Sequence, residues 1–236
     1  MKLSEDGKAA QLDLPGFSAE SEIIGSVFDL TMEDVERLKK NKPKRLGIVC
    51  TRSNCQENLH SFGGAGGGST PDGACRSCGA SVIDWEMVYD KASSDFDAKI
   101  DRFNKEWIRH FFLHVPITGR IDEYARKQGT SGLKAAAVHQ FRQSKMLRYM
   151  PALDWNQTPM LDGTIVHWAR HATACCCRSC MKYWHDVPLS HELVPAEIDY
   201  FANLVMHYVR IRMPNLDVGK KISIAIGPTM EHAKAN

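Results

Sequence analysis

The eight cysteines of this 236-residue chain fall into two groups of four. The first group is Cys50, Cys55, Cys75 and Cys78, and the second is Cys175, Cys176, Cys177 and Cys180. Each group ends in the same tetrapeptide, Cys-Arg-Ser-Cys, at residues 75–78 and 177–180. Two cysteines separated by two residues can direct both thiolates to one centre from a tight turn, which is the geometry that tetrahedral zinc requires. The spacing therefore predicts two metal sites, each holding one Zn²⁺ ion.

The first group has the features of a structural zinc site. Gly79 follows the second cysteine of the tetrapeptide and permits the positive φ that points backbone N–H groups at the sulfur atoms. Strand-like flanks at residues 46–50 and 81–85, interrupted by the glycine-rich stretch 61–73, make residues 46–90 resemble a zinc ribbon. We expect Cys50, Cys55, Cys75 and Cys78 to be the four ligands, which would leave no open position for chemistry. His60 is a substitute ligand, and free core cysteines are the alternative.

The second group lies within residues 167–185, which hold four cysteines and three histidines. If Cys180 opens a helix, a histidine five residues later can converge on the same ion from the next turn. The expected ligand set is Cys177, Cys180 and His185, completed by His171 or Cys176. Because adjacent side chains diverge in regular backbone, at least one of the three consecutive cysteines should be a packing residue or a free thiol. An iron–sulfur cluster and a Cys–His nucleophile are the alternatives at this position.

Two classes of zinc enzyme are excluded by the pattern around the second group. The helical metalloprotease signature needs a second histidine three residues after Glu192, and that position holds Pro195. The base-deaminase signature, His-x-Glu followed by Pro-Cys-x-x-Cys, is absent from the sequence. An open Cys/His site with Glu192, His191 or Asp186 as proton carrier stays possible, so the sequence leaves open whether the protein is an enzyme.

Composition and charge bound the class of protein. The chain is 43% apolar but has no apolar run long enough to span a bilayer and no apolar stretch near its start, so we expect a cytoplasmic protein without membrane contact. Clustered cysteines in that reducing compartment favour metal binding over disulfides. The net charge is +2, but residues 101–150 hold ten basic and four acidic side chains. This excess predicts nucleic-acid contact, against the alternative of a solvated helix face. The candidate contact residues are Arg109, Lys134, Arg142, Lys145 and Arg148.

The elements that must position these residues predict an α+β fold. We expect an irregular arm and a short helix from Thr31 over residues 1–45, the ribbon-like unit over 46–90, and a mostly helical domain over 91–236. Apolar spacing predicts helices over 95–114 and 121–128, a third from Thr130 toward Tyr149, and a last one opened by Pro195. Alternation at 221–226 predicts a short strand.

The C-terminal half resembles a small bacterial and phage family known only as a domain of unknown function. The resemblance covers about residues 139–213 and rests on His171-Ala172-Thr173-Ala174, Cys176-Cys177-Arg178, Cys180 and Trp184-His185. The family has a glycine after this last histidine and a Lys-Gly-Arg element after the proline, where this chain has Asp186 and Leu189-Ser190-His191. The resemblance implies a metal site and no particular reaction, and it makes Cys175 the least favoured ligand, since the family lacks a cysteine there.

Three functional hypotheses follow. The first is a module with structural zinc that contacts nucleic acid or a larger protein assembly. The second is a zinc-dependent hydrolase, for example a nuclease, centred on the second cysteine group. The third is a scaffolding subunit without chemistry of its own.

Overall fold

The computed structural model describes residue 33 and residues 48–62, 73–143 and 158–217, and these are mostly helical. The sequence predicts α+β, but no strand occurs in the described part of the chain, so only the helical component is confirmed. After the short 3-10 helix η3 (Cys55–Glu57), the α-helices are α2 (Trp85–Tyr89), α3 (Phe96–Phe103), α4 (Trp107–His114), α5 (Arg120–Arg142), α7 (Ile165–Ala172), α8 (Arg178–His185) and α9 (Pro195–Arg212).

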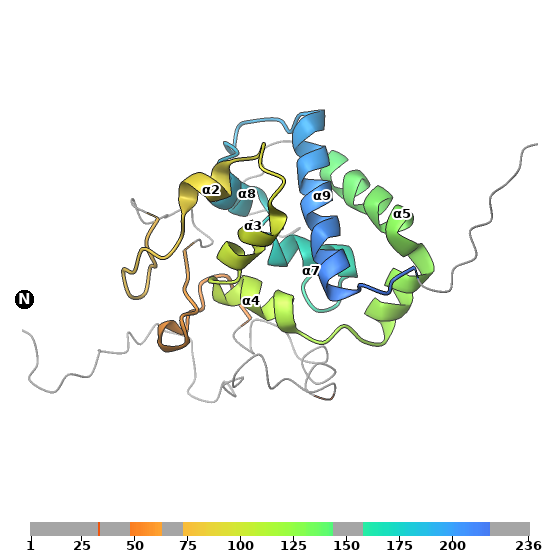
Figure 1. The fold of residues 1–236 in the computed structure, drawn as a ribbon, viewed down its shortest axis with the longest axis horizontal. Coiled ribbons are helices and arrows are strands. Elements are labelled where there is room, and N and C mark those ends of the chain that lie inside the picture. Colours follow the sequence, from red (N-terminus) through yellow and green to blue (C-terminus); the bar gives the residue numbers. More distant parts are fainter. Residues whose placement is uncertain (1–32, 34–47, 63–72, 144–157, 218–236) are drawn as a thin grey trace, which may run out of the picture.

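Helix α9 is the centre of the helical body and lies beside α5, α7 and α3 (Figure 1). It begins at Pro195, as predicted, because proline at the first helical position gives up no hydrogen bond. Its buried face includes Phe201 and Tyr208, and the Tyr208 hydroxyl donates to the carbonyl of Phe112 at 2.7 Å. This packing fixes α4 and α7, which position the second cysteine group, against the core.

The single helix predicted over residues 95–114 is wrong, because it is divided into α3 and α4 at residues 104–106. Residues 48–62, called the N-terminal segment below, contact the helical body at this break. The backbone of His60 donates to the carbonyl of Lys105 at 2.7 Å and accepts from the N–H of Trp107 at 2.9 Å. The Glu106 side chain turns into the core at the same point. Apolar periodicity continues through the break, so the sequence pattern does not reveal it.

The two helices predicted on either side of Gly129 are both present within α5. Gly129 has φ 64° and ψ 178°, which breaks the helical path between them. The Asp217 carboxylate accepts from the backbone N–H of Thr130 at 3.2 Å and also from its hydroxyl. Asp217, which follows α9 in the sequence, therefore caps the second half of α5 at its first N–H group, that of Thr130.

The segment predicted as a zinc ribbon has a different local structure. Its described residues form isolated bridges between Asn54 and Leu59 and between His60 and Glu106. The strand predicted over 81–85 is absent, and residues from Trp85 begin α2 instead, since the Asp84 carboxylate caps that helix by accepting from Met87 N–H at 3.1 Å. The ribbon architecture is thus not confirmed.

Several predictions fall outside the described residues. They are the arm and helix within residues 1–45, apart from Glu33, the strand at 221–226, and the basic residues Lys145 and Arg148. In the described ranges, no helix combines the length and apolar character that crossing a membrane requires.

Candidate metal centres

The first centre consists of Cys55, His60, Cys75 and Cys78, and its four ligand atoms all lie within 4.8 Å of one another. The Sγ atoms of Cys55 and Cys75 are 3.7 Å apart, and Cys78 Sγ is 3.5 Å from His60 Nδ1. Tetrahedral zinc with bonds of about 2.3 Å to sulfur and 2.0–2.1 Å to nitrogen requires S···S and S···N separations of about 3.8 and 3.6 Å. The two observed separations match one zinc ion.

His60 has the orientation expected of a metal ligand. Its Nε2 lies 2.8 Å from Asn58 Oδ1, so Nε2 carries the proton and donates, and the lone pair of Nδ1 faces the sulfur atoms. Asn58 has the left-handed φ of 59°, which turns the chain back after η3 toward His60. The residue considered as a substitute in the sequence therefore lies within the first centre.

The Cys75–Gly79 turn has the predicted knuckle geometry. Gly79 has φ 75°, its N–H donates to the Cys75 carbonyl at 2.8 Å, and the Ser77 N–H points at Cys75 Sγ at 3.4 Å. Burial opposes ionisation of Cys75, but backbone N–H groups directed at its sulfur lower the pKa of this thiol to about 6. Burial, together with neighbouring thiols, raises the pKa of Cys55 to about 12. The turn thus favours at least one thiolate at neutral pH.

The second centre contains Cys176, Cys177 and Cys180, whose sulfur atoms lie within 4.8 Å of one another. The Sγ atoms of Cys176 and Cys180 are 3.6 Å apart, which again suits ligands of one zinc ion. Cys177 is the extended N-cap of α8, with φ −152°, and Cys180 lies in the first turn of that helix. The corner between extended chain and helix brings Cys176 and Cys177 to the same side, which regular backbone would not allow.

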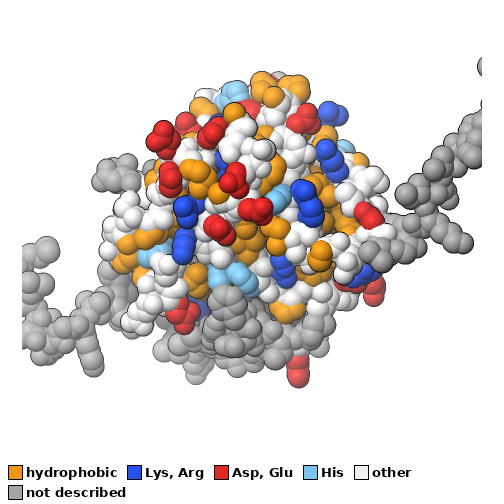
Figure 2. Space-filling model, in the orientation of Figure 1, with side chains coloured by type: hydrophobic (Ala, Val, Ile, Leu, Met, Phe, Trp, Pro, Cys, Tyr) orange, Lys and Arg blue, Asp and Glu red, His pale blue; other side chains and the backbone are white. Residues whose placement is uncertain are grey.

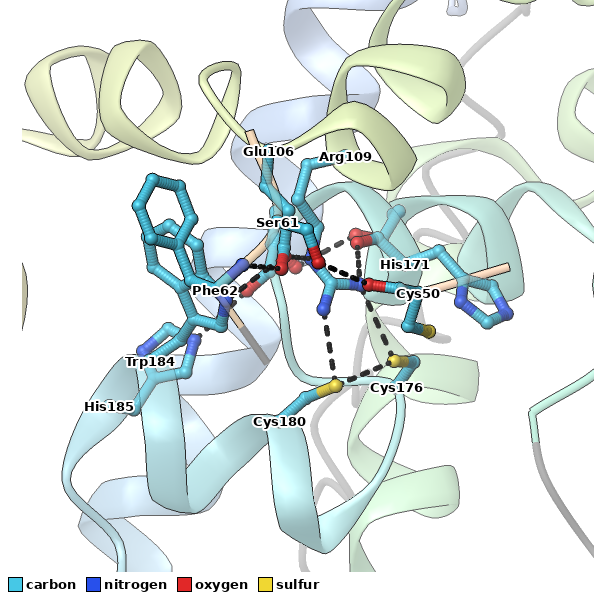
Figure 3. Close-up of polar contacts among 12 residues, drawn as sticks. Cys50, Ser61, Phe62, Glu106, Arg109, His171, Cys176, Cys180, Trp184 and His185 are labelled. Atoms are coloured by element: carbon cyan, nitrogen blue, oxygen red, sulfur yellow. Dashed lines mark hydrogen bonds and ion pairs between the residues drawn. The ribbon is translucent and has the colours of Figure 1, made fainter. Parts of the chain in front are cut away.

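Cys50 lies at the second centre, although its spacing assigned it to the first. Neighbouring Cys180, together with the charge of Arg109, lowers the pKa of Cys50, although burial opposes its ionisation. Figure 3 shows its sulfur directed toward Cys176 and Cys180. Cys50 is thus absent from the first group of converging ligand atoms, where His60 takes the position that Cys50 was expected to fill.

A buried cation faces the sulfur atoms of the second centre. Arg109 is 1% exposed, and its guanidinium donates to Cys180 Sγ at 3.1 Å and to Cys176 Sγ at 3.6 Å (Figure 3). It also donates to the His171 carbonyl at 2.8 Å and to Glu106 Oε2 at 2.9 Å. Burial opposes the charge, but the sulfur atoms and the carboxylate raise the pKa of Arg109 above its ordinary value. The guanidinium therefore remains positive beside the thiols.

Glu106 joins this cation to the N-terminal segment. Its carboxylate is fully buried and accepts from Arg109, from the backbone N–H of Phe62 at 3.2 Å and from Trp184 Nε1 at 3.0 Å. One carboxylate thus connects the N-terminal segment, α4 and α8. A buried charge with this many partners is expensive to leave unpaired, so the network fixes the relative positions of the three elements.

His185 has other partners than the sulfur atoms. Its Nε2 lies 2.9 Å from the Thr173 carbonyl and its Nδ1 lies 3.3 Å from the Tyr200 hydroxyl. Burial lowers the pKa of His185 to about 3, so the ring is neutral. Cys175 is likewise apart from the other sulfur atoms: it contacts the Thr173 hydroxyl at 3.2 Å, and burial raises its pKa to about 12. Both pack within the core.

His171 is the other histidine that the sequence offers as a ligand of the second centre. Its Nε2 contacts the carbonyls of Thr158 and Pro159 at 3.1 and 3.2 Å, and its ring stacks on Phe112 with centroids 4.7 Å apart. Its Nδ1 is buried and has no hydrogen-bond partner among the described residues. It is not part of the group of converging ligand atoms.

The basic residues expected to contact nucleic acid are in different environments. Arg109 is buried, contrary to the expectation of a surface residue, whereas Lys134 and Arg142 are exposed on α5. Acidic and basic side chains alternate on the face drawn in Figure 2. The aromatic stripe around Arg109, including Trp107, Phe111 and Phe112, is core. These buried aromatic side chains therefore form no exposed stacking surface.

The comparison with protein families is limited to the helical body. Residues 97–210 match the family model described as Domain of unknown function (DUF4186). No solved structure matches the chain. The matched region begins at residue 97, whereas the resemblance seen in the sequence begins at about residue 139. The match therefore also covers α4 and most of α3 and α5. Arg109 and the three cysteines of the second centre lie inside the matched region, and all four residues of the first centre lie outside it.

Sequence reasoning missed Glu106 and the inward role of Arg109. Both stand in Lys105-Glu106-Trp107-Ile108-Arg109, where a charged pair three residues apart lies within an apolar stripe. A charged residue on the apolar face of a helix is a signal of a buried ion pair. No sequence signal indicates that this pair lies beside sulfur atoms more than sixty residues away.

Proposed function

We propose that this chain is a zinc-binding protein whose two metals are structural. The observation that carries this is the first centre, where three cysteine sulfur atoms and an oriented histidine converge at separations that fit one tetrahedral ion. Thiolate and imidazole together favour zinc over the hard cations. A multi-iron cluster would hold its cysteine sulfur atoms farther apart than the spacing seen at either centre.

The metals have a structural task in this fold. The segment that carries Cys55 and His60 has little regular structure of its own, and it attaches to the helical body through the break before α4. A structural zinc site contributes about 10–16 kcal/mol of coupled binding and folding, which is enough to order such a segment. We therefore expect the first zinc to bind residues 48–62 to residues 73–83, and the second to hold the start of α8 to the core.

A zinc-dependent hydrolase is the less supported alternative. Catalytic zinc keeps a coordination position for water or substrate, next to an acid or base. His185, one proposed participant, has both ring nitrogens bonded elsewhere, and the proposed acids Asp186 and Glu192 are exposed side chains. No described group beside the second centre is arranged as a general base.

For the partner, we keep nucleic acid or a protein assembly as the proposal. Its support in the described residues is now limited to the exposed Lys134 and Arg142 on α5. The structural role of the metals does not depend on which partner is bound.

Chelation of the full chain tests the structural role. Trp85 and Trp184 pack with their ring centroids 5.0 Å apart, and their indole N–H groups donate to the Gly73 carbonyl and to the Glu106 carboxylate, so near-ultraviolet circular dichroism reports the order of these segments. We expect a zinc chelator to abolish this signal and added zinc, but not magnesium, to restore it. A chelated, metal-free chain with an unchanged signal would refute the proposal.

A further inference from the structure

The sequence predicts Cys50 as a ligand of the first centre, but four other residues fill that centre. Cys55, His60, Cys75 and Cys78 already supply the four ligands that tetrahedral zinc accepts. The second centre has three converging sulfur atoms and needs a fourth ligand to close. Figure 3 shows the Cys50 sulfur directed toward the sulfur atoms of Cys176 and Cys180, which the Arg109 guanidinium contacts.

We infer that Cys50 is the fourth ligand of the second centre, which is therefore a four-cysteine site, and that the ligands of the two centres are interleaved along the chain. This inference rests on the proposed function, since it requires both centres to bind metal. Only four residues separate Cys50, in one centre, from Cys55, in the other. The described chain thus crosses directly from one metal to the next.

The backbone around Cys50 is held in position independently of its sulfur. The Ser61 hydroxyl donates to the Cys50 carbonyl at 3.4 Å, and Ile48 is fully buried. The Arg52 guanidinium lies over the Trp107 ring, 4.3 Å from its centroid. Ser61 also accepts from the Arg76 N–H of the knuckle at 2.8 Å, so the first centre and the Cys50 turn share an anchor. The backbone that carries Cys50 is therefore held on both sides of this residue.

His171 is the competing fourth ligand. A histidine that donates through Nε2 to a carbonyl and offers Nδ1 to a metal is a common arrangement, and Nδ1 of His171 has no hydrogen-bond partner in the described residues. Cys50 is favoured for two reasons. Neither side chain belongs to the converging group, but the Cys50 sulfur is directed toward Cys176 and Cys180 (Figure 3), whereas the His171 ring stacks on Phe112 and its Nε2 lies within hydrogen-bond distance of two carbonyls. The buried cation of Arg109 also offsets the extra negative charge of a fourth thiolate, which a neutral imidazole would not bring.

The interleaved arrangement couples the two metals. Binding at the first centre orders the turn that presents Cys50, so the second centre should bind more weakly when the first is disabled. His60→Ala removes a ligand of the first centre only, and we expect it to lower zinc affinity at the second centre as well. Cys175→Ser is the matched control, since this thiol belongs to neither centre. It should leave the affinity of both centres within about twofold.

The test is a proton–cadmium correlation spectrum of the full chain loaded with ¹¹³Cd, which links each metal to the β-protons of its cysteines. One cadmium should correlate with Cys50, Cys176, Cys177 and Cys180. The other should correlate with Cys55, Cys75 and Cys78 and with the ring of His60. Cys50→Ser should lower the affinity of the second centre at least about 100-fold, more than the loss of an outer-shell partner does.

Each other result has one meaning. Two bound cadmium ions with Cys50 correlated to the first centre, or to neither, overturn the inference and leave the proposed function standing. A correlation of the second cadmium with the His171 ring, in place of Cys50, does the same. A chain that binds no cadmium or zinc overturns both the inference and the proposed function.

Discussion

The buried ion pair between Glu106 and Arg109 gives the sharpest stability prediction. Replacing Arg109 with methionine keeps most of the side-chain volume but removes the cation from a position that is 1% exposed. Glu106 would keep its donors from Phe62 and Trp184 but would lose the buried positive charge of Arg109. Breaking one partner of a buried pair costs about 3–5 kcal/mol. For a chain of this size, that cost lowers Tm by roughly 6–20 °C.

The assay is thermal unfolding at a fixed excess of zinc, followed by zinc competition with a chromophoric chelator. Arg109→Met should also weaken the second centre, about 10–100-fold, because its sulfur atoms lose two N–H donors, and it should weaken the first centre less. Glu106→Gln combined with Arg109→Met should recover much of the lost stability, since a neutral amide needs no counter-ion.

Arg126→Met is the matched control, because Arg126 forms a solvent-exposed pair with Asp122, four residues earlier on the same helix. It should leave Tm unchanged. The reasoning fails if Arg109→Met unfolds within 2 °C of the unmodified chain, or if the double variant is no more stable than the single one.

Three further predictions concern single features. Gly79→Ala should cost roughly 1–2 kcal/mol through the φ of 75° and not through a clash, so Gly79→Asn should cost less; equal losses in urea unfolding would contradict this. Burial lowers the pKa of His110 to about 4 from its ordinary 6.5, so the unfolded chain binds the extra proton between these values and stability falls as the pH drops. Protonation of His110 should lower the free energy of unfolding by about 2 kcal/mol between pH 7 and 5, and His110→Gln should abolish this part of the pH dependence. If His110→Gln leaves the pH dependence of stability unchanged, His110 is not its source. If α5 contacts nucleic acid, Lys134→Glu with Arg142→Glu should reduce the salt dependence of retention on DNA by about two ionic contacts, and no retention of the unmodified chain at low salt would rule out that partner.

The helical body was predictable because its signals are local. Pro195 at the start of α9 and Gly129 within α5 act through backbone conformation, which neighbouring residues specify. The break between α3 and α4 was not predictable, because it depends on His60, more than forty residues away, pairing with Lys105 and Trp107. The inward orientation of Glu106 was not predictable for the same reason, because its partners Phe62 and Trp184 are distant in the sequence.

Cysteine spacing identified the cysteines of both centres but not their partition. A Cys-x-x-Cys pair defines two ligands locally, and Cys75 with Cys78 and Cys177 with Cys180 each lie together as expected. The remaining ligands come from loops whose path is set by packing. His60 therefore takes the place of Cys50 in the first centre, since the backbone near Cys50 is held by Ser61 and by the contact of Arg52 with Trp107.

The central claim is that two zinc ions are bound and that each has its own ligand set. Native mass spectrometry of the full chain, with metal analysis of the same sample, tests it most directly. The account predicts two zinc ions per chain, falling to one in Cys78→Ser, which removes a ligand of the first centre, and no loss in Cys175→Ser. A chain that carries no zinc, or a Cys175→Ser variant that loses one, would contradict the account.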